Sequence, residues 1–182
     1  VGMISLGCSK NQVDAERLLA MLAGDGFTIC NDMTECDAVI VNTCGFIEDA
    51  KKESIDTILE CCAAKGEGSL KCVAVTGCLA ERYRSQIEEE IPEVDAVVGC
   101  ASNKAIDSIV ARLFNGEDHL ESYGPKKDFP LGGKRVIGTP AHYAYLKIAE
   151  GCNNRCHYCA IPGIRGPLHS RDLADCVAEA RW

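Results

Sequence analysis

Short, nearly continuous apolar runs alternate with longer amphipathic segments over the first 114 residues of the chain. Such runs, rich in β-branched residues, are typical of strands that lie buried on both faces of a parallel sheet. Their alternation with helical segments predicts an α/β fold built on a parallel sheet. The predicted strands cover residues 3–7, 38–42, 72–77 and 96–99, with a weaker strand at 27–30.

The segments between these runs show helical periodicity. Two stripes follow the i, i+3, i+4, i+7 pattern of a helix with one apolar face, so we expect both to pack against the sheet. A shorter stripe comprises Ala80, Tyr83 and Ile87, and Ser102 is the predicted N-cap of the last helix. The two longer stripes are Ile55, Ile58, Leu59 and Cys62, and Ile106, Ile109, Val110 and Leu113.

The pattern changes after residue 114. Residues 115–141 contain five glycines and three prolines among scattered charges, which predicts a connection between domains. Alternating apolar and polar residues then predict a strand over residues 143–149, and a helix is expected over 172–182. The predicted domains are residues 1–114, a linker at 115–141, and the start of a second domain at 142–182.

Composition narrows the class of protein. With no apolar run near the roughly 18 residues of a membrane helix, and no signal peptide, we expect a soluble, cytoplasmic protein. The net charge of −8 argues against a nucleic-acid surface on this portion. It suits a solvated acidic surface, or more weakly a basic protein partner. The two ends lack the signals of natural termini, so we expect the sequence to be an excerpt of a longer chain.

Thirteen cysteines are many for 182 residues without a secretion signal. Cytosolic thiols stay reduced, so this number indicates metal binding or catalysis more than disulfides. Four cysteines directly follow predicted strands: Cys8, Cys44, Cys78 and Cys100. In an open parallel sheet all these strand ends lie along one edge, where ligands bind. The sequence therefore predicts a shared iron-sulfur or zinc site there, although a cysteine can also serve as a small buried apolar residue.

The remaining isolated cysteines lack this placement, and we interpret them as core residues. They are Cys30, Cys36, Cys61, Cys62, Cys72 and Cys176.

A second group of thiols follows the strand predicted at 143–149. Cys152, Cys156 and Cys159 have C-x3-C-x2-C spacing and can hold three corners of an iron-sulfur cluster while leaving one iron open for chemistry. Zinc with His157 as a fourth ligand is the alternative. It is disfavoured because zinc ligands usually come as two separated pairs and His157 lies between two of the cysteines.

The motifs together resemble those of the radical S-adenosylmethionine (SAM) methylthiotransferases. They cover essentially the whole chain, and their order and spacing are far more specific than any one of them alone. The matching stretches are Ser5-Leu6-Gly7-Cys8-Ser9-Lys10-Asn11, Val13-Asp14-Ala15-Glu16, Asn42-Thr43-Cys44, Thr76-Gly77-Cys78, Glu150-Gly151-Cys152 with Cys156 and Cys159, Ile161-Pro162, Arg165-Gly166 and Ser170-Arg171.

The resemblance implies roles for the matched cysteines. Cys152, Cys156 and Cys159 would bind a 4Fe-4S cluster whose open iron is chelated by SAM, and a low-potential electron donor would reduce it. Tyr158 matches the position that commonly packs the adenine of SAM, although it could equally be a core aromatic. A second 4Fe-4S cluster, which the family uses in delivering sulfur, would be bound by Cys8, Cys44 and Cys78. Cys100 has no counterpart in the family.

Within the family, the opening motif resembles the RimO branch, which adds a methylthio group to the β-carbon of an aspartate in small-subunit ribosomal protein uS12. The tRNA-modifying branch called MiaB is the alternative, and a non-catalytic iron-sulfur carrier is an alternative from another class. The resemblance also implies that residues 142–182 are the first βα unit of a radical SAM partial TIM barrel. The excerpt alone is therefore expected to be inactive.

Overall fold

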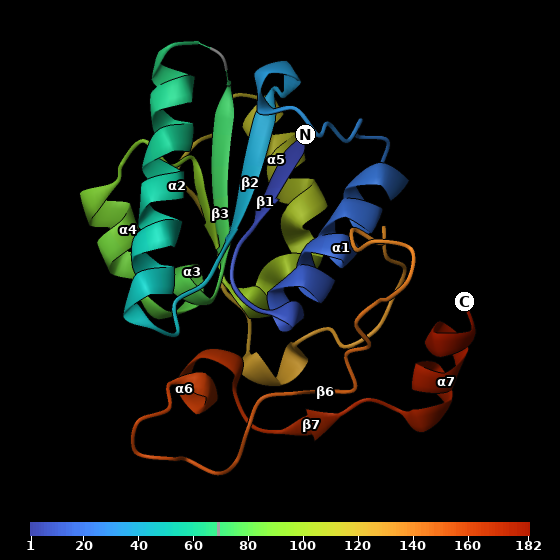
Figure 1. The fold of residues 1–182 in the computed structure, drawn as a ribbon. Helices are drawn as coiled ribbons and strands as arrows, with labels where there is room; N and C mark the ends of the chain where they lie inside the picture. Colours follow the sequence, from blue (N-terminus) through green and yellow to red (C-terminus); the bar gives the residue numbers. More distant parts are fainter. Residues whose placement is uncertain (69) are drawn as a thin grey trace.

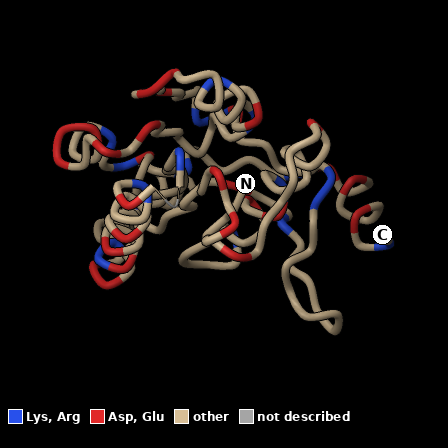
Figure 2. The backbone as a smooth tube through the Cα atoms, turned by 90° about the horizontal axis from the view of Figure 1, so that it is seen from above, with Lys and Arg blue, Asp and Glu red and all other residues tan. Residues whose placement is uncertain are grey.

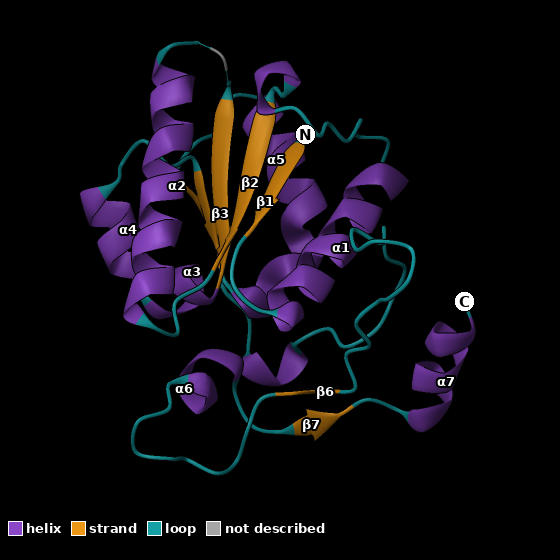
Figure 3. Cartoon of the chain, in the orientation of Figure 1, coloured by secondary structure: helices purple, strands orange, loops and turns teal. Residues whose placement is uncertain are grey.

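The computed structural model of the protein, which describes residues 1–68 and 70–182, contains a five-stranded parallel sheet (Figures 1 and 3). Its strands follow one another in sequence order, each hydrogen-bonded to the next. The predicted α/β fold with a parallel sheet is confirmed. The strands are β1 (Gly2–Ser5), β2 (Ala38–Thr43), β3 (Cys72–Gly77), β4 (Ala96–Val98) and β5 (Leu120–Ser122).

Helices cover both faces of the sheet (Figure 1). Because successive side chains of a strand point to opposite faces, β2 sends Val39 and Val41 to one core and Ile40 to the other. The first core lies beneath α2 (Glu48–Gly66), α3 (Cys78–Arg82) and α4 (Arg84–Glu90). The second lies beneath α1 (Ser9–Gly24) and α5 (Ile106–Phe114). No helix in the described part of the chain is long and apolar enough to cross a membrane.

The weak strand predicted at residues 27–30 is reduced to a single bridge. Cys30 pairs with Gly2 in parallel, and its N–H donates to the Val1 carbonyl at 3.0 Å. This edge segment lies on the side of β1 away from β2. The chain thus leaves β1 towards one edge through α1 and leaves β2 towards the other through α2. The carboxyl ends of β1 and β2 therefore meet at a topological switch point, where open α/β sheets bind ligands.

The stripe predicted for α2 is only half correct. Ile58 and Cys62 are buried, but Ile55 and Leu59 are 39% and 48% exposed. Ser54 explains the rotation of the helix: its hydroxyl accepts from the Cys44 N–H at 2.9 Å and donates to the Cys44 carbonyl at 3.0 Å, which turns this polar residue inward. By contrast, the whole stripe predicted for α5 is buried and confirmed.

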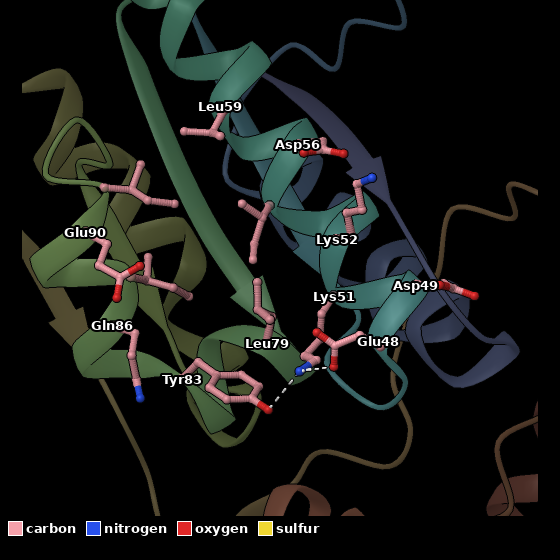
Figure 4. Close-up of a pocket in the computed structure, with 13 residues that line it drawn as sticks. Glu48, Asp49, Lys51, Lys52, Asp56, Leu59, Leu79, Tyr83, Gln86 and Glu90 are labelled. Atoms are coloured by element: carbon pink, nitrogen blue, oxygen red, sulfur yellow. Dashed lines mark hydrogen bonds and ion pairs between the residues drawn. The ribbon is translucent and has the colours of Figure 1, made fainter.

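Ile55 and Leu59 instead line a groove of about 570 Å³ between α2 and α4 (Figure 4). Leu79, Ile87 and Ile91 form its opposite apolar wall, and acidic side chains from α2 and α4 border it. At one end, Lys51 donates to the Tyr83 hydroxyl at 3.4 Å. Among the described residues that line this groove there is no cysteine, which separates it from the thiol sites described below.

Local predictions fail where the chain changes helix type. The stripe of Ala80, Tyr83 and Ile87 is divided between α3 and α4, because Tyr83 leaves the helical conformation at φ −123°. Ser102 is not an N-cap: it lies inside the 3-10 helix η2 (Cys100–Ala105), whose own N-cap is Gly99.

Strand β5 also falls within the segment predicted to be a linker, so that segment extends the sheet before it becomes mostly loop (Figure 3).

The strand predicted at residues 143–149 is wrong over most of its length. Only β6 (Ala149–Glu150) forms, paired antiparallel with β7 (His169–Ser170). The expected burial is reversed: Lys147 is buried, whereas Leu146 and Ile148 are 40% and 62% exposed. Lys147 turns inward because two carboxylates bind it, as described below. The assignment of this region to a barrel stays a prediction.

The remaining elements are η1 (Met33–Glu35), η3 (Lys126–Asp128), α6 (Ile161–Arg165) and α7 (Leu173–Arg181). The predicted terminal helix is confirmed by α7, which begins after Asp172; the Asp172 carboxylate accepts from the Ala174 N–H at 2.8 Å. The β6, α6 and β7 elements lie beneath the carboxyl ends of the sheet strands (Figure 1).

Gly77 shows how closely the strand ends approach one another. Its φ of +98° favours glycine, and a Cβ there would lie 2.3 Å from the Thr43 carbonyl oxygen. We expect Gly77→Ala to lower the free energy of unfolding by about 3 kcal/mol, because it adds backbone strain to a clash with β2. Gly24→Ala is the matched control, since no atom lies within 4 Å of its added Cβ, and it should be neutral or stabilising. Urea denaturation of both variants measures the difference; equal stabilities would contradict this account.

Candidate functional site

The strand-end cysteines converge at the carboxyl edge of the sheet, among them the three that the resemblance assigns to one cluster. Cys8 is the N-cap of α1, Cys44 follows β2, and Cys78 is the first residue of α3. The Cys44 sulfur lies 2.9 Å from the point that a Cβ on Gly7 would occupy, so it packs against the residue before Cys8. Burial raises the pKa of Cys44, and the nearby thiols of Cys78 and Cys8 raise it further. The structure thus brings these three predicted residues together.

The site is open to solvent on the Cys8 side. Cys44 and Cys78 are buried, whereas Cys8 is exposed. A hollow of about 250 Å³ borders Cys8 and separates the loop after β1 from Tyr143 and Tyr145. A group bound by the three thiols would therefore be reachable from one side only.

Asn11, buried in α1, ties the strand ends together. Its side-chain N–H2 donates to the Leu6 carbonyl at 2.9 Å and to the Thr43 carbonyl at 2.8 Å. Its side-chain oxygen accepts from Arg165 at 2.5 Å and lies 3.7 Å from the Cys78 sulfur. One amide therefore fixes the ends of β1 and β2 and reaches the third cysteine.

Cys78 has the most perturbed environment of the three thiols. The pKa of Cys78 is lowered to about 6 by a hydrogen bond with Cys100 and by the Arg165 guanidinium, which together outweigh the opposing effect of burial. Cys100, which donates that bond from a buried position, has its pKa raised well above its ordinary value. Cys100 thus joins the site as a neighbour of Cys78, as its strand-end position suggested.

A buried ion network connects this edge to the C-terminal segment. Asp14 of α1 accepts from Lys147 and from Arg165, each at 2.7 Å. Glu150 of β6 binds the same two cations, at 2.5 Å and 3.0 Å, and also Lys10 at 3.0 Å. All four residues other than Lys10 are buried. Such charges are stable only when paired, so the network fixes β6 and α6 against α1.

A second network lies farther along α1. Arg135 is buried and binds Glu16 through Nε at 3.0 Å and Nη2 at 2.8 Å. It also donates to Glu179 of α7 at 2.5 Å, and Arg171 pairs with the same carboxylate. Two carboxylates of α1 thus bind the chain that follows the sheet. Asp14 binds Lys147 and Arg165, and Glu16 binds Arg135.

Glu150 makes the network sensitive to acid. Burial alone would raise the pKa of Glu150, but the positive charges of Arg165 and Lys147 outweigh burial and hold it at about 2, below the ordinary 4.5. A depressed pKa stabilises the fold at every pH above 4.5, and this contribution is lost as the pH falls towards 2.

We therefore expect Glu150→Gln to lower the free energy of unfolding by about 3 kcal/mol at pH 7. The difference from wild type should shrink as the pH falls from 4.5 towards 2. Denaturant titrations over this range measure it, with the exposed Glu53→Gln as a control that should stay within about 0.5 kcal/mol of wild type. A difference that does not change with pH would count against the ionised Glu150.

The second thiol group lies in the loop between β6 and α6. The Cys152 N–H donates to the Gly166 carbonyl at 3.1 Å, and the Cys159 N–H donates to the Cys156 carbonyl at 3.0 Å. Cys156 is exposed and the other two cysteines are half-buried. Tyr158 is 87% exposed and contacts no core. The loop thus presents its thiols at the surface, directly after the buried Glu150.

The donor sets can be compared with the groups that thiolates bind. A single ion such as zinc needs its ligand atoms about 2.3 Å from one point, and no three His, Cys, Asp or Glu side chains in the described residues are so arranged. An iron-sulfur cluster takes its thiolates at separate corners and so accepts a wider spacing. At the sheet edge a buried cation, Arg165, lies 3.4 Å from the Cys78 sulfur, and such a cation suits a negatively charged group bound by thiolates.

Sequence reasoning assigned no role to the residues that join the two cysteine groups. Asp14 and Arg165 are 151 positions apart, and no spacing in the sequence relates them. Two signals were available: Asp14 and Glu16 are charged residues set among apolar neighbours, and most of the residues involved lie in the matching motif stretches, to which no role beyond that of the cysteines was assigned. The residues missed in this way are Asn11, Asp14, Glu16, Arg135, Lys147, Glu150 and Arg165.

Comparison with known proteins adds two findings. Residues 1–99 match a family described as uncharacterized protein family UPF0004. The chain is also 46% identical to the ribosomal protein uS12 methylthiotransferase RimO of Caldicellulosiruptor saccharolyticus, 46% to that of Clostridioides difficile and 47% to that of Geobacter sulfurreducens. Each match covers 100% of this chain and 41% of the relative, so the chain spans about two fifths of the length of these curated proteins.

Proposed function

Since the chain belongs to the protein family UPF0004, we propose that it forms part of a methylthiotransferase that modifies ribosomal protein uS12. The observation that carries the proposal is the convergence of Cys8, Cys44 and Cys78 on one edge of the sheet, next to the segment that bears the second cysteine loop. The similarity of the whole chain to relatives named for this activity supports the same conclusion.

Two sets of residues would hold the cofactors. Cys8, Cys44 and Cys78 would bind one 4Fe-4S cluster, and the loop cysteines Cys152, Cys156 and Cys159 a second one. When bound, the clusters and SAM supply the electron, the carbon radical and the sulfur that methylthiolation of an unactivated carbon requires.

The protein residues position these groups. Asn11 holds together the strand ends that carry Cys8 and Cys44. The Asp14–Arg165 and Asp14–Lys147 pairs fix the segment that bears the cysteine loop against α1. Tyr158, exposed on that loop, is available to pack against the adenine of SAM. On the same proposal residues 142–182 begin a second domain, while β5 pairs with β4 and so extends the first domain beyond residue 114.

The proposed partners are ribosomal protein uS12 as substrate and a low-potential electron donor, in the cytoplasm. Lys and Arg form only short, separated stretches along the chain (Figure 2). This distribution offers little for a phosphate backbone and supports a protein rather than an RNA substrate for this portion.

The test is incubation of the whole reconstituted methylthiotransferase of which this chain forms part with SAM, dithionite and either uS12 or tRNA. We expect the mass of one methylthio group on an aspartate of uS12 and none on tRNA. If the mass were added to tRNA and not to uS12, the proposed substrate would be wrong and the chain would belong to the tRNA-modifying branch. A protein that binds iron but never cleaves SAM to 5′-deoxyadenosine would be an iron-sulfur carrier.

A further inference from the structure

Arg165 contacts a cysteine of the first site although it belongs to the second half of the chain. We propose that Arg165 is a positioning residue that hydrogen-bonds the Cys78 sulfur of the bound cluster and raises the reduction potential of that cluster. This inference rests on the proposed function, because it requires a cluster at Cys8, Cys44 and Cys78. It assigns Arg165 an effect on the electronic state of the cluster in addition to its part in folding.

The geometry directs one end of the guanidinium at the sulfur. Nη1 donates to Asp14 at 2.7 Å and to Glu150 at 3.0 Å, which fixes the plane of the group. Nη2 donates to Asn11 at 2.5 Å and lies 3.4 Å from the Cys78 sulfur. Arg165 is 1% exposed, so water does not compete for these contacts. A cysteine bound to iron has no proton to donate and can only accept this hydrogen bond.

The net charge of the network also favours a higher reduction potential of the cluster. Three cations, Lys10, Lys147 and Arg165, share two carboxylates, Asp14 and Glu150. The network therefore carries one net positive charge. Arg165 is its cation in contact with a thiol. Hydrogen bonds to the sulfurs and nearby charge both set the potential of an iron-sulfur cluster. A buried cation favours the reduced form, which is more negative by one charge.

Cys100 adds a second donor to the same sulfur. It is buried beside Cys78, so its thiol can donate a hydrogen bond to the sulfur of a bound Cys78. Its loss should move the potential in the same direction as loss of Arg165, but less, since a neutral thiol is a weaker donor than a guanidinium.

Arg135 provides a matched control. It is buried in the same interface, binds a carboxylate of α1 as Arg165 does, and pairs with Glu16 at 2.8 Å. Within the described part of the chain, its hydrogen bonds and ion pairs involve no cysteine. Arg135→Met therefore removes the same charge and a similar structural contact without touching the thiol site.

The measurement is an EPR-monitored redox titration of the reconstituted protein. Replacing Cys152, Cys156 and Cys159 by alanine leaves the first cluster as the only signal. In each half-reaction the cluster accepts one electron from dithionite, and no bond forms or breaks. Arg165→Met should lower the equilibrium constant for reduction about tenfold or more, which is about 59 mV to more negative potential for one electron. Arg135→Met should leave the potential unchanged.

The outcomes separate this inference from the proposed function. A parent protein that binds no iron refutes the first cluster itself, and the inference with it. A parent with about four irons and an unchanged potential in Arg165→Met refutes only the inference, as do equal shifts in both variants. If Arg165→Met fails to bind iron, Arg165→Lys is tested instead, because lysine keeps the positive charge but lacks the paired N–H donors of the guanidinium. A smaller shift to more negative potential supports the proposal, and an unchanged potential contradicts it.

Discussion

Replacing Asp14 by alanine is expected to cost about 3–5 kcal/mol of stability, because it leaves two buried cations with one carboxylate between them. Lys147 and Arg165 would then share only Glu150. These two residues belong to the C-terminal segment, whereas most of the sheet core does not depend on them. We therefore expect the loss to appear first as release of the C-terminal segment from α1.

Limited proteolysis combined with urea denaturation measures this effect. The variant should be cut rapidly in the loop between β5 and β6, while a fragment containing the sheet persists. Asp56→Ala, which removes an exposed carboxylate from α2, should leave both the cleavage rate and the stability within about 0.5 kcal/mol of wild type. If the two variants behaved alike, the buried network would not be what joins the segments.

In the whole enzyme of which this chain forms part, replacing Cys8, Cys44 and Cys78 together by alanine is expected to abolish methylthio transfer while SAM cleavage continues. The iron content should fall from about eight atoms to about four, because only the cysteine loop would still bind a cluster. Without the thiols at the sheet edge, no cluster remains there to deliver sulfur. Iron analysis, 5′-deoxyadenosine production and the mass of uS12 measure the three parts of this prediction.

The matched control replaces three cysteines of the core. Cys36, Cys61 and Cys72 are buried among apolar side chains away from the strand-end site. Their replacement removes the same number of thiols and should lower stability without lowering the iron content. Methylthio transfer that survives in the Cys8, Cys44 and Cys78 variant would refute the role of this site.

The strands and the first thiol site could be predicted because both depend on local sequence. A parallel strand buried on two faces needs a continuous apolar run, so β3 has the predicted bounds of residues 72–77. A cysteine directly after such a strand is carried to the carboxyl edge wherever the strand lies in the sheet. Cys8, Cys44 and Cys78 also lie close together because β1, β2 and β3 are neighbours in the sheet, which the sequence did not reveal.

The remaining features depend on contacts that local patterns do not contain. The rotation of α2 is set by the hydrogen bonds between Ser54 and the Cys44 backbone, which outweigh the apolar stripe containing Ile55 and Leu59. Lys147 occupies an inward position because Asp14, 133 residues earlier, compensates its charge. Alternation predicted a strand there, but the paired charge decided which side chains are buried.

The role of Arg165 could not be predicted for the same reason. Its partners come from α1, β6 and α3, and only the folded chain places them around one guanidinium. The sequence showed that two cysteine groups exist. The structure shows which charged residues fix the segments that bear these two groups against each other.

The central claim, that this chain binds two separate iron-sulfur clusters, is tested most directly by counting iron. The reconstituted holoprotein should contain about eight iron atoms, and replacement of Cys152, Cys156 and Cys159 by alanine should leave about four. The residual iron should retain the EPR signal of a reduced four-iron cluster. Zero iron after this triple replacement would contradict the claim, because Cys8, Cys44 and Cys78 would then bind no cluster of their own.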